Sequence, residues 1–220
     1  MTHPKSSPVE PGRMLSADFA PLLTSFDLDV LDAHDSTIYG IHNDLTIGYA
    51  NSAWMRFAME NAGAESLCDP ENVLGSNILD QISGPLRSYY RELFCGVLRM
   101  KKTANTGYEC SSPTIMRYYH MEVLTLPTAD ADPRGLLIIN SRKLDPVGHS
   151  EPRAAVTRAQ PRDYINDHGY IVNCSNCRRF QRADQPHTWE WVPAYLNAPP
   201  ADVSHGLCSI CLDYYFPASR

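Results

Sequence analysis

The chain has 220 residues, of which 43% are hydrophobic and 20% charged, so most of it can fold around a core. Its net charge of −6, from 19 Lys and Arg against 25 Asp and Glu, argues against a strongly basic protein that wraps nucleic acid. No apolar run approaches the roughly 20 residues of a membrane helix, and no secretory signal is visible. We therefore expect a cytoplasmic protein without membrane contact, built from a medium domain and a small one.

The chain begins with residues rich in Pro, Ser and polar groups, and we expect residues 1–25 to form a flexible segment. Two strands are then predicted, at Thr37–His42 and at residues 46–50, on either side of a turn. After them, Asn51 offers a capping oxygen to a short helix predicted over residues 53–61.

A longer helix is predicted over Leu86–Met100, because its apolar residues recur at the i, i+3, i+4 and i+7 spacing of one helix face. A shorter helix is expected before it, over residues 73–82. Three strand-like runs follow, at residues 107–111, 115–126 and 135–141. The predicted order is therefore two strands, several short helices, one longer helix and three strands.

This order resembles that of the PAS domain over residues 26–143. The run at residues 44–54 (DLTIGYANSAW) is similar to the family's segment around its Asn, and the run at residues 73–78 (VLGSNI) is similar to its Gly-containing segment. Leu86–Met100 matches its long helix. The resemblance implies an α+β fold, with a five-stranded antiparallel sheet and flanking helices over one face. It also implies a pocket that often serves as a sensor site, without implying a particular ligand.

Several side chains could line such a pocket. Aromatic residues at helical spacing more often form plain core, so this assignment depends on the fold. The imidazole of His120 is expected to be buried and hydrogen-bonded on its strand rather than bound to haem. Cys110 could face the pocket too, although a role in a turn is the favoured interpretation. The pocket candidates are Trp54, Phe57, Tyr89, Tyr90 and His120.

The composition changes after the third of these strands. Residues 144–163 contain three prolines and show no sustained hydrophobic period, which predicts a linker. From residue 164 to residue 220, aromatic residues and cysteines return together. We therefore expect four parts: a flexible segment, a PAS-like sensor domain, a linker and a small C-terminal module.

The C-terminal module contains the strongest chemical signal, two CxxC pairs separated by 30 residues. Two such turns can complete a tetrahedral four-thiolate shell with Zn–S distances of about 2.3 Å. The ion would then staple a module too small to rely on its own core. Zinc is favoured over unbound thiols or two disulfides in a chain without secretory features, while iron stays open because sulfur alone does not select the metal. The predicted ligands are Cys174, Cys177, Cys208 and Cys211.

His205 precedes the second pair. Because four sulfurs already fill a tetrahedron, we expect it to order the turn or to donate a hydrogen bond to a sulfur rather than to bind the metal. The module also resembles a cysteine-rich segment that follows PAS or receiver domains in bacterial signalling proteins. The resemblance lies in the CxxC pair before Arg178 and Arg179, in residues 191–196 (WVPAYL) and in residues 204–211 (SHGLCSIC). It implies no function for the segment.

These patterns predict a non-enzymatic bacterial signalling protein. Its PAS-like domain would sense a small ligand of unknown identity or mediate protein contacts, and its zinc module would be structural. The sequence contains no P-loop, no Gly-x-Ser-x-Gly and no His-Glu-x-x-His, which argues against catalysis. We expect a homodimer that contacts an unidentified signalling protein.

Two other functions remain open. The four cysteines could form a redox or metal switch that releases its ion on oxidation. Alternatively, the zinc module could belong to a regulator associated with nucleic acid. Its four basic and five acidic residues between 164 and 220 provide a poor electrostatic footprint for that role.

Overall fold

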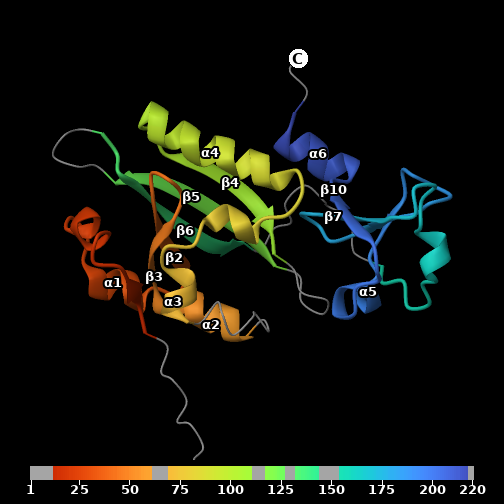
Figure 1. Cartoon of the computed structure of the whole chain (residues 1–220), viewed down its shortest axis with the longest axis horizontal. Helices are drawn as coiled ribbons and strands as arrows, with labels where there is room; N and C mark the ends of the chain where they lie inside the picture. Colours follow the sequence, from red (N-terminus) through yellow and green to blue (C-terminus); the bar gives the residue numbers. More distant parts are fainter. Residues whose placement is uncertain (1–11, 61–68, 111–116, 127–131, 144–153, 218–220) are drawn as a thin grey trace, which may run out of the picture.

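An antiparallel sheet organises residues 12–143, which we call the first part of the chain (Figure 1). The computed structural model describes residues 12–60, 69–110, 117–126, 132–143 and 154–217. The strand order is β1-β3-β2-β6-β5-β4, and every neighbouring pair is antiparallel. Five of these strands were predicted, and β1 is a sixth strand that the sequence did not indicate. The bounds are β1 (Met14–Leu15), β2 (Thr37–His42), β3 (Ile47–Ala50), β4 (Ala104–Glu109), β5 (Tyr118–Leu126) and β6 (Gly135–Lys143).

Both faces of this sheet are covered. One face carries the larger hydrophobic core, to which α2, α3, η3 and α4 contribute, and the other carries a smaller core beneath η1 and α1. The PAS resemblance implied helices over one face, so the second covered face is a departure from it. The bounds are η1 (Ala20–Leu23), α1 (Leu28–Ala33), α2 (Ser52–Glu60), α3 (Pro70–Val73), η3 (Ile78–Gln81) and α4 (Leu86–Met100).

The N-terminal segment expected to be flexible is folded from β1 onward. Phe19 is 0% exposed, and its ring lies over three glycines of the sheet, Gly40, Gly48 and Gly135. A Cβ atom on Gly40 or Gly48 would lie within 2.4 Å of that ring. These glycines therefore form a slot for an aromatic side chain from a distant segment, which composition alone does not reveal.

The short helix predicted over residues 73–82 is wrong as a single element. The chain forms α3 and η3 there, with a turn between them in which Gly75 has φ +82. The Gly75 N–H donates to the Ile47 carbonyl at 2.8 Å, and the Ile47 N–H donates to the Ser76 carbonyl at 2.9 Å. A continuous helix would need these backbone groups for its own hydrogen bonds.

Asn51 joins three elements of the first part. Its Oδ1 accepts the Ile38 N–H of β2 at 3.0 Å and the Trp54 N–H of α2 at 3.2 Å, so it caps α2 as predicted. Its Nδ2 donates to the carbonyls of Leu31 at 3.1 Å and Ser36 at 3.0 Å. A fully buried amide with all these partners fixes how α1, β2 and α2 meet.

The cysteine module, residues 164–217, has its own sheet in the order β10-β7-β8-β9. Its small core includes Tyr164, Phe180 and Val192. Of the predicted linker, residues 144–153 lie outside the described residues, while the Val156 N–H already donates to the Trp191 carbonyl at 2.8 Å. The bounds are η4 (Pro161–Asp163), β7 (Ile171–Cys174), β8 (Phe180–Gln181), β9 (Trp189–Glu190), α5 (Pro193–Asn197), β10 (Val203–Gly206) and α6 (Ser209–Tyr215).

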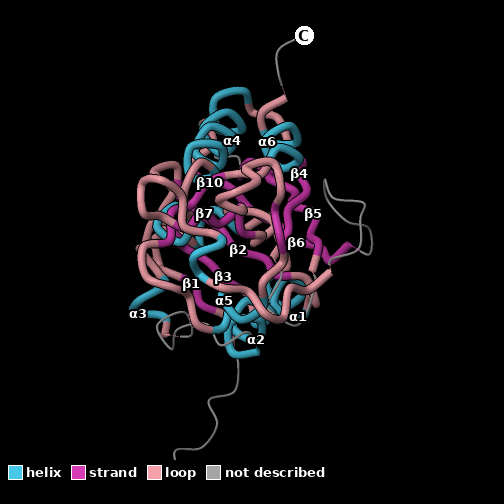
Figure 2. Tube along the Cα trace, turned by 90° about the vertical axis from the view of Figure 1, so that its right-hand side faces the viewer, coloured by secondary structure: helices cyan, strands magenta, loops and turns pink. Residues whose placement is uncertain are grey.

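The cysteine module lies against the first part rather than apart from it. Helix α6 runs beside α4 in both views (Figures 1 and 2). The Tyr89 ring of α4 meets the Tyr215 ring of α6 with centroids 4.8 Å apart, and Tyr215 belongs to the larger core of the first part. Within the described ranges, no helix combines the length and apolar character needed to cross a membrane.

Candidate metal centre and adjoining cavity

Two parallel strands bring the CxxC pairs together. β7 and β10 are hydrogen-bonded neighbours, with Gly206 opposite Cys174 in the register. Cys174 ends β7. Cys208 lies two residues after the end of β10 and directly precedes α6, which contains Cys211. Each strand therefore delivers one CxxC pair to the same end of this small sheet.

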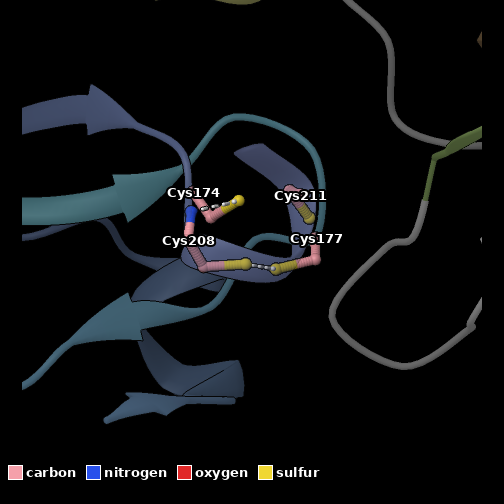
Figure 3. Close-up of side chains that lie close together, drawn as sticks. All are labelled: Cys174, Cys177, Cys208 and Cys211. Atoms are coloured by element: carbon pink, nitrogen blue, oxygen red, sulfur yellow. Dashed lines mark hydrogen bonds between the residues drawn. The ribbon is translucent and has the colours of Figure 1, made fainter. Parts of the chain in front are cut away.

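The four sulfur atoms form one buried cluster (Figure 3). All four Sγ atoms lie within 4.8 Å of one another, and the side chains of Cys174, Cys177, Cys208 and Cys211 are at most 2% exposed. The Sγ atoms of Cys177 and Cys208 are 3.8 Å apart. A tetrahedral zinc ion with Zn–S bonds of about 2.3 Å requires sulfurs about 3.8 Å apart. The predicted ligands therefore lie where a four-thiolate metal site needs them.

Protein N–H groups point at two of these sulfurs. The Cys208 N–H donates to the Cys174 Sγ at 3.4 Å, and the Asn176 Nδ2 donates to the Cys211 Sγ at 3.2 Å. In the absence of an ion, the hydrogen bond from Cys177 lowers the pKa of Cys174, and the hydrogen bond with Cys174 raises the pKa of Cys177. Crowded thiols thus resist joint ionisation, and a bound cation would offset the repulsion between thiolates.

His205 lies in β10, outside the four-cysteine cluster. The residue is exposed overall, and partial desolvation of its ring, followed by the nearby Arg178, lowers its pKa. The residue borders a cavity on the side facing the first part of the chain. The hydrogen bond from His205 to a sulfur stays a prediction.

The cysteine module is attached to β4 by side-chain hydrogen bonds. The Glu109 N–H donates to Asn176 Oδ1 at 3.1 Å, and the Gly107 N–H donates to the Tyr214 hydroxyl at 2.9 Å. The Tyr215 hydroxyl lies 2.9 Å from Asn176 Oδ1 and 3.2 Å from the Gly107 carbonyl, and can donate to either. Because β4 is the last strand of its sheet, these contacts cover a free sheet edge.

A close backbone approach at Gly84 completes the attachment, and we expect Gly84→Ala to loosen it. A Cβ there would lie 2.6 Å from the Ser175 Oγ and 3.0 Å from the His205 Cβ, and Gly84 also has φ +62. Gly75→Ala is the matched control, since Gly75 has φ +82 with no atom within 4 Å of the added Cβ. Urea unfolding should show Gly84→Ala to be the more destabilising change by about 1–2 kcal/mol. Equal losses of unfolding free energy in the two variants would mean that the side chains near Gly84 move aside without an energetic penalty.

A cavity of about 430 Å³ lies between the helices, the first sheet and the cysteine module. Seven aromatic residues line it, and four residues of the cysteine module form part of its wall. Burial raises the pKa of Tyr39, Tyr90 and Tyr108, so these hydroxyls stay neutral. The contributing module residues are Ser175, Asn176, Arg178 and His205.

Three of the predicted pocket residues, Trp54, Phe57 and Tyr90, line this cavity, whereas Tyr89 and His120 do not. Tyr89 turns toward α6, where its ring contacts Tyr215. His120 was expected to be buried, but it is half-exposed and lies 3.0 Å from Asn105 Oδ1, on the face of β5 opposite the cavity. Since the sheet is covered on both faces, alternation along β5 did not show which face encloses the cavity.

Sequence reasoning missed the polar groups of the cavity. Asn140 is 4% exposed, and within the described part of the chain its Oδ1 has no hydrogen-bond partner. The same holds, among the residues described, for the Ser175 Oγ. Cys110, for which the sequence favoured a turn but left the pocket open, borders the cavity as well, and burial raises its pKa. Asn140 directly follows the apolar run at residues 136–139 in a predicted strand, and that position was the one signal available for it.

No family model and no curated protein match the chain. Solved structures with similar folds include a sensory box sensor histidine kinase from Vibrio cholerae, 18% identical, covering 57% of this chain and 93% of that chain with a TM-score of 0.37. The PAS domain of Bordetella pertussis BvgS is 13% identical over 53% of this chain and 83% of that chain, with a TM-score of 0.42.

The PAS domain of the Cronobacter turicensis quorum-sensing receptor RpfR, solved in complex with C12:0, is 14% identical over 50% of this chain and 94% of that chain, with a TM-score of 0.36. The neighbours are thus sensory and PAS domains.

Proposed function

We propose that the chain is a non-enzymatic sensory protein with a PAS-like domain that binds a small, largely apolar molecule. The observation that carries this proposal is the cavity of about 430 Å³, lined by aromatic rings around the buried Asn140 Oδ1. Within the described residues that oxygen has no donor, and leaving a buried acceptor unpaired costs free energy. A ligand that has an apolar ring and one hydroxyl or amine donor fits this lining.

We further propose that Cys174, Cys177, Cys208 and Cys211 hold a structural zinc ion. Support comes from the buried tetrahedral-type spacing of their sulfurs and from two N–H groups that point at them. Such an ion would supply stability to a module whose own core is small. Because the sulfurs are enclosed, we favour the structural role over the redox switch, and peroxide should leave the metal bound.

The ligand proposal can be tested with 4-fluorophenol as a probe, followed by ¹⁹F NMR. Its ring suits the aromatic lining and its hydroxyl can donate to Asn140 Oδ1. We expect Asn140→Leu to weaken its binding about tenfold, because the phenol hydroxyl then loses its acceptor in a buried site.

Fluorobenzene is the control, since it has no hydroxyl and should bind both proteins with similar affinity. If 4-fluorophenol fails to bind the zinc-containing chain, the cavity does not accept this class of molecule. If Asn140→Leu binds it unchanged, then Asn140 does not contact the ligand.

Homodimerisation and contact with a signalling protein remain part of the proposal. Light scattering at micromolar concentration should give the mass of a dimer, and a monomer mass would contradict that part.

A further inference from the structure

We propose that the metal centre and the ligand cavity form one coupled device, in which the first CxxC turn is a wall of the cavity and Asn176 connects the two. This inference rests on the function proposed above and concerns how that site is regulated. Ser175 and Asn176, the two residues between Cys174 and Cys177, both line the cavity. The metal ligands and the cavity wall therefore belong to the same short turn.

Asn176 is suited to this role because it is buried and its amide bonds in two directions. The residue is 2% exposed, and its Nδ2 donates to the Cys211 Sγ at 3.2 Å. Its Oδ1 accepts the Glu109 N–H at 3.1 Å and lies 2.9 Å from the Tyr215 hydroxyl. An amide has distinct donor and acceptor ends, so rotating it would place N–H against N–H at Glu109. Through this amide, the position of the Cys211 sulfur determines the position of Glu109 at the end of β4.

The end of β4 is the part of the first sheet that depends on the cysteine module. The N–H groups of Gly107 and Glu109 point away from β5, and both end on module side chains. Glu109 also borders the cavity. If the four sulfurs lost their ion, the bonds that tie the two CxxC pairs to a common centre would be lost, and the first CxxC turn would shift. The cavity would then lose a wall, and two backbone donors of the edge strand would lose their acceptors.

The same contacts carry an effect in the opposite direction. A molecule in the cavity packs against Ser175 and Asn176, and therefore favours the arrangement of the turn that binds metal. Linkage requires that the two effects be equal: zinc raises ligand affinity by the factor by which ligand raises zinc affinity. We expect a factor of about five or more, within the usual range for coupled sites.

Hydrogen exchange of the full chain tests the coupling without any ligand. Zinc-bound protein is compared with protein stripped by a chelator under reducing conditions. We expect the amides of Gly107 and Glu109 to exchange about tenfold faster after stripping, while β2 in the middle of the sheet keeps its protection. Unchanged exchange in β4, together with loss of protection at Cys174 and Ser175, would overturn the proposal.

Two buried asparagines of the module provide matched variants. Asn176→Ala should speed the hydrogen exchange of the Glu109 amide even with zinc bound. Asn173→Ala is the control, because Asn173 is 3% exposed and its Nδ2 donates to the carbonyls of Arg178 and Arg179 within the module. The Asn173→Ala variant should leave the hydrogen exchange of β4 unchanged. If both variants expose β4 equally, the attachment does not run through Asn176 and the proposal is overturned.

The 4-fluorophenol probe separates this inference from the proposed function. We expect it to bind zinc-containing protein about fivefold more tightly than stripped protein, and to slow zinc transfer to a chelator. Equal affinity for the two forms would overturn the coupling and leave the sensory cavity intact. A chain that takes up no zinc, as judged by elemental mass spectrometry, would instead overturn the metal centre and the coupling together.

Discussion

Cys208→Ser is expected to abolish stoichiometric zinc binding and to unfold the cysteine module. Serine cannot replace a thiolate in this shell, and the three remaining sulfurs leave the tetrahedral shell incomplete. Structural zinc contributes roughly 10–16 kcal/mol of apparent binding free energy at neutral pH, so the loss should exceed what so small a core can offset. The zinc content measured by elemental mass spectrometry should fall from about one ion per chain to none.

Cys95→Ser is the matched control, because Cys95 is an exposed cysteine on α4. It should retain its zinc and its thermal stability. The unfolding in Cys208→Ser should reach β4, since Tyr215 belongs to the core of the first part and Asn176 accepts the Glu109 N–H. A Cys208→Ser protein with full zinc content would show that the ion is held elsewhere. Iron in place of zinc would reopen the redox interpretation.

The local parts of the fold could be predicted from the sequence. The long helix has the predicted bounds, Leu86–Met100, because its apolar spacing is regular and Lys101 adopts the left-handed conformation that ends it. β2 likewise has its predicted bounds. The split of residues 73–82 was missed because it depends on a strand elsewhere in the chain, where Ile47 accepts the Gly75 N–H and donates to the Ser76 carbonyl.

The four-cysteine cluster could be predicted from the sequence and the cavity only in part, for one physical reason. A CxxC turn holds two ligands by local geometry, so spacing alone identifies Cys174 and Cys177. The cavity wall depends instead on contacts between distant segments, such as Asn176 with Glu109, whose residues carry no local signal. Trp54 and Tyr90 were found because they lie on helices with an evident buried face, whereas His120 was misplaced on a strand buried on both sides.

Phe19→Ala is expected to cost about 3–5 kcal/mol of unfolding free energy, the usual loss for a fully buried aromatic residue. The loss should be near the upper end because the slot cannot collapse readily. Its floor is the backbone at Gly40, Gly48 and Gly135. Gly40 and Gly135 pair with neighbouring strands, and the Gly48 carbonyl accepts the Ser16 N–H at 2.9 Å. Urea unfolding measures the change, with Val30→Ala, at a position 62% exposed on α1, as the control.

This prediction also decides how the N-terminal segment contributes to the fold. If residues 12–25 were a flexible extension, Phe19→Ala would change stability no more than Val30→Ala does. If they belong to the core, as the position of Phe19 indicates, the variant should also lose hydrogen-exchange protection in β1, where Met14 and Leu15 pair with β3. The second covered face would then be as necessary to this sheet as the face that encloses the cavity.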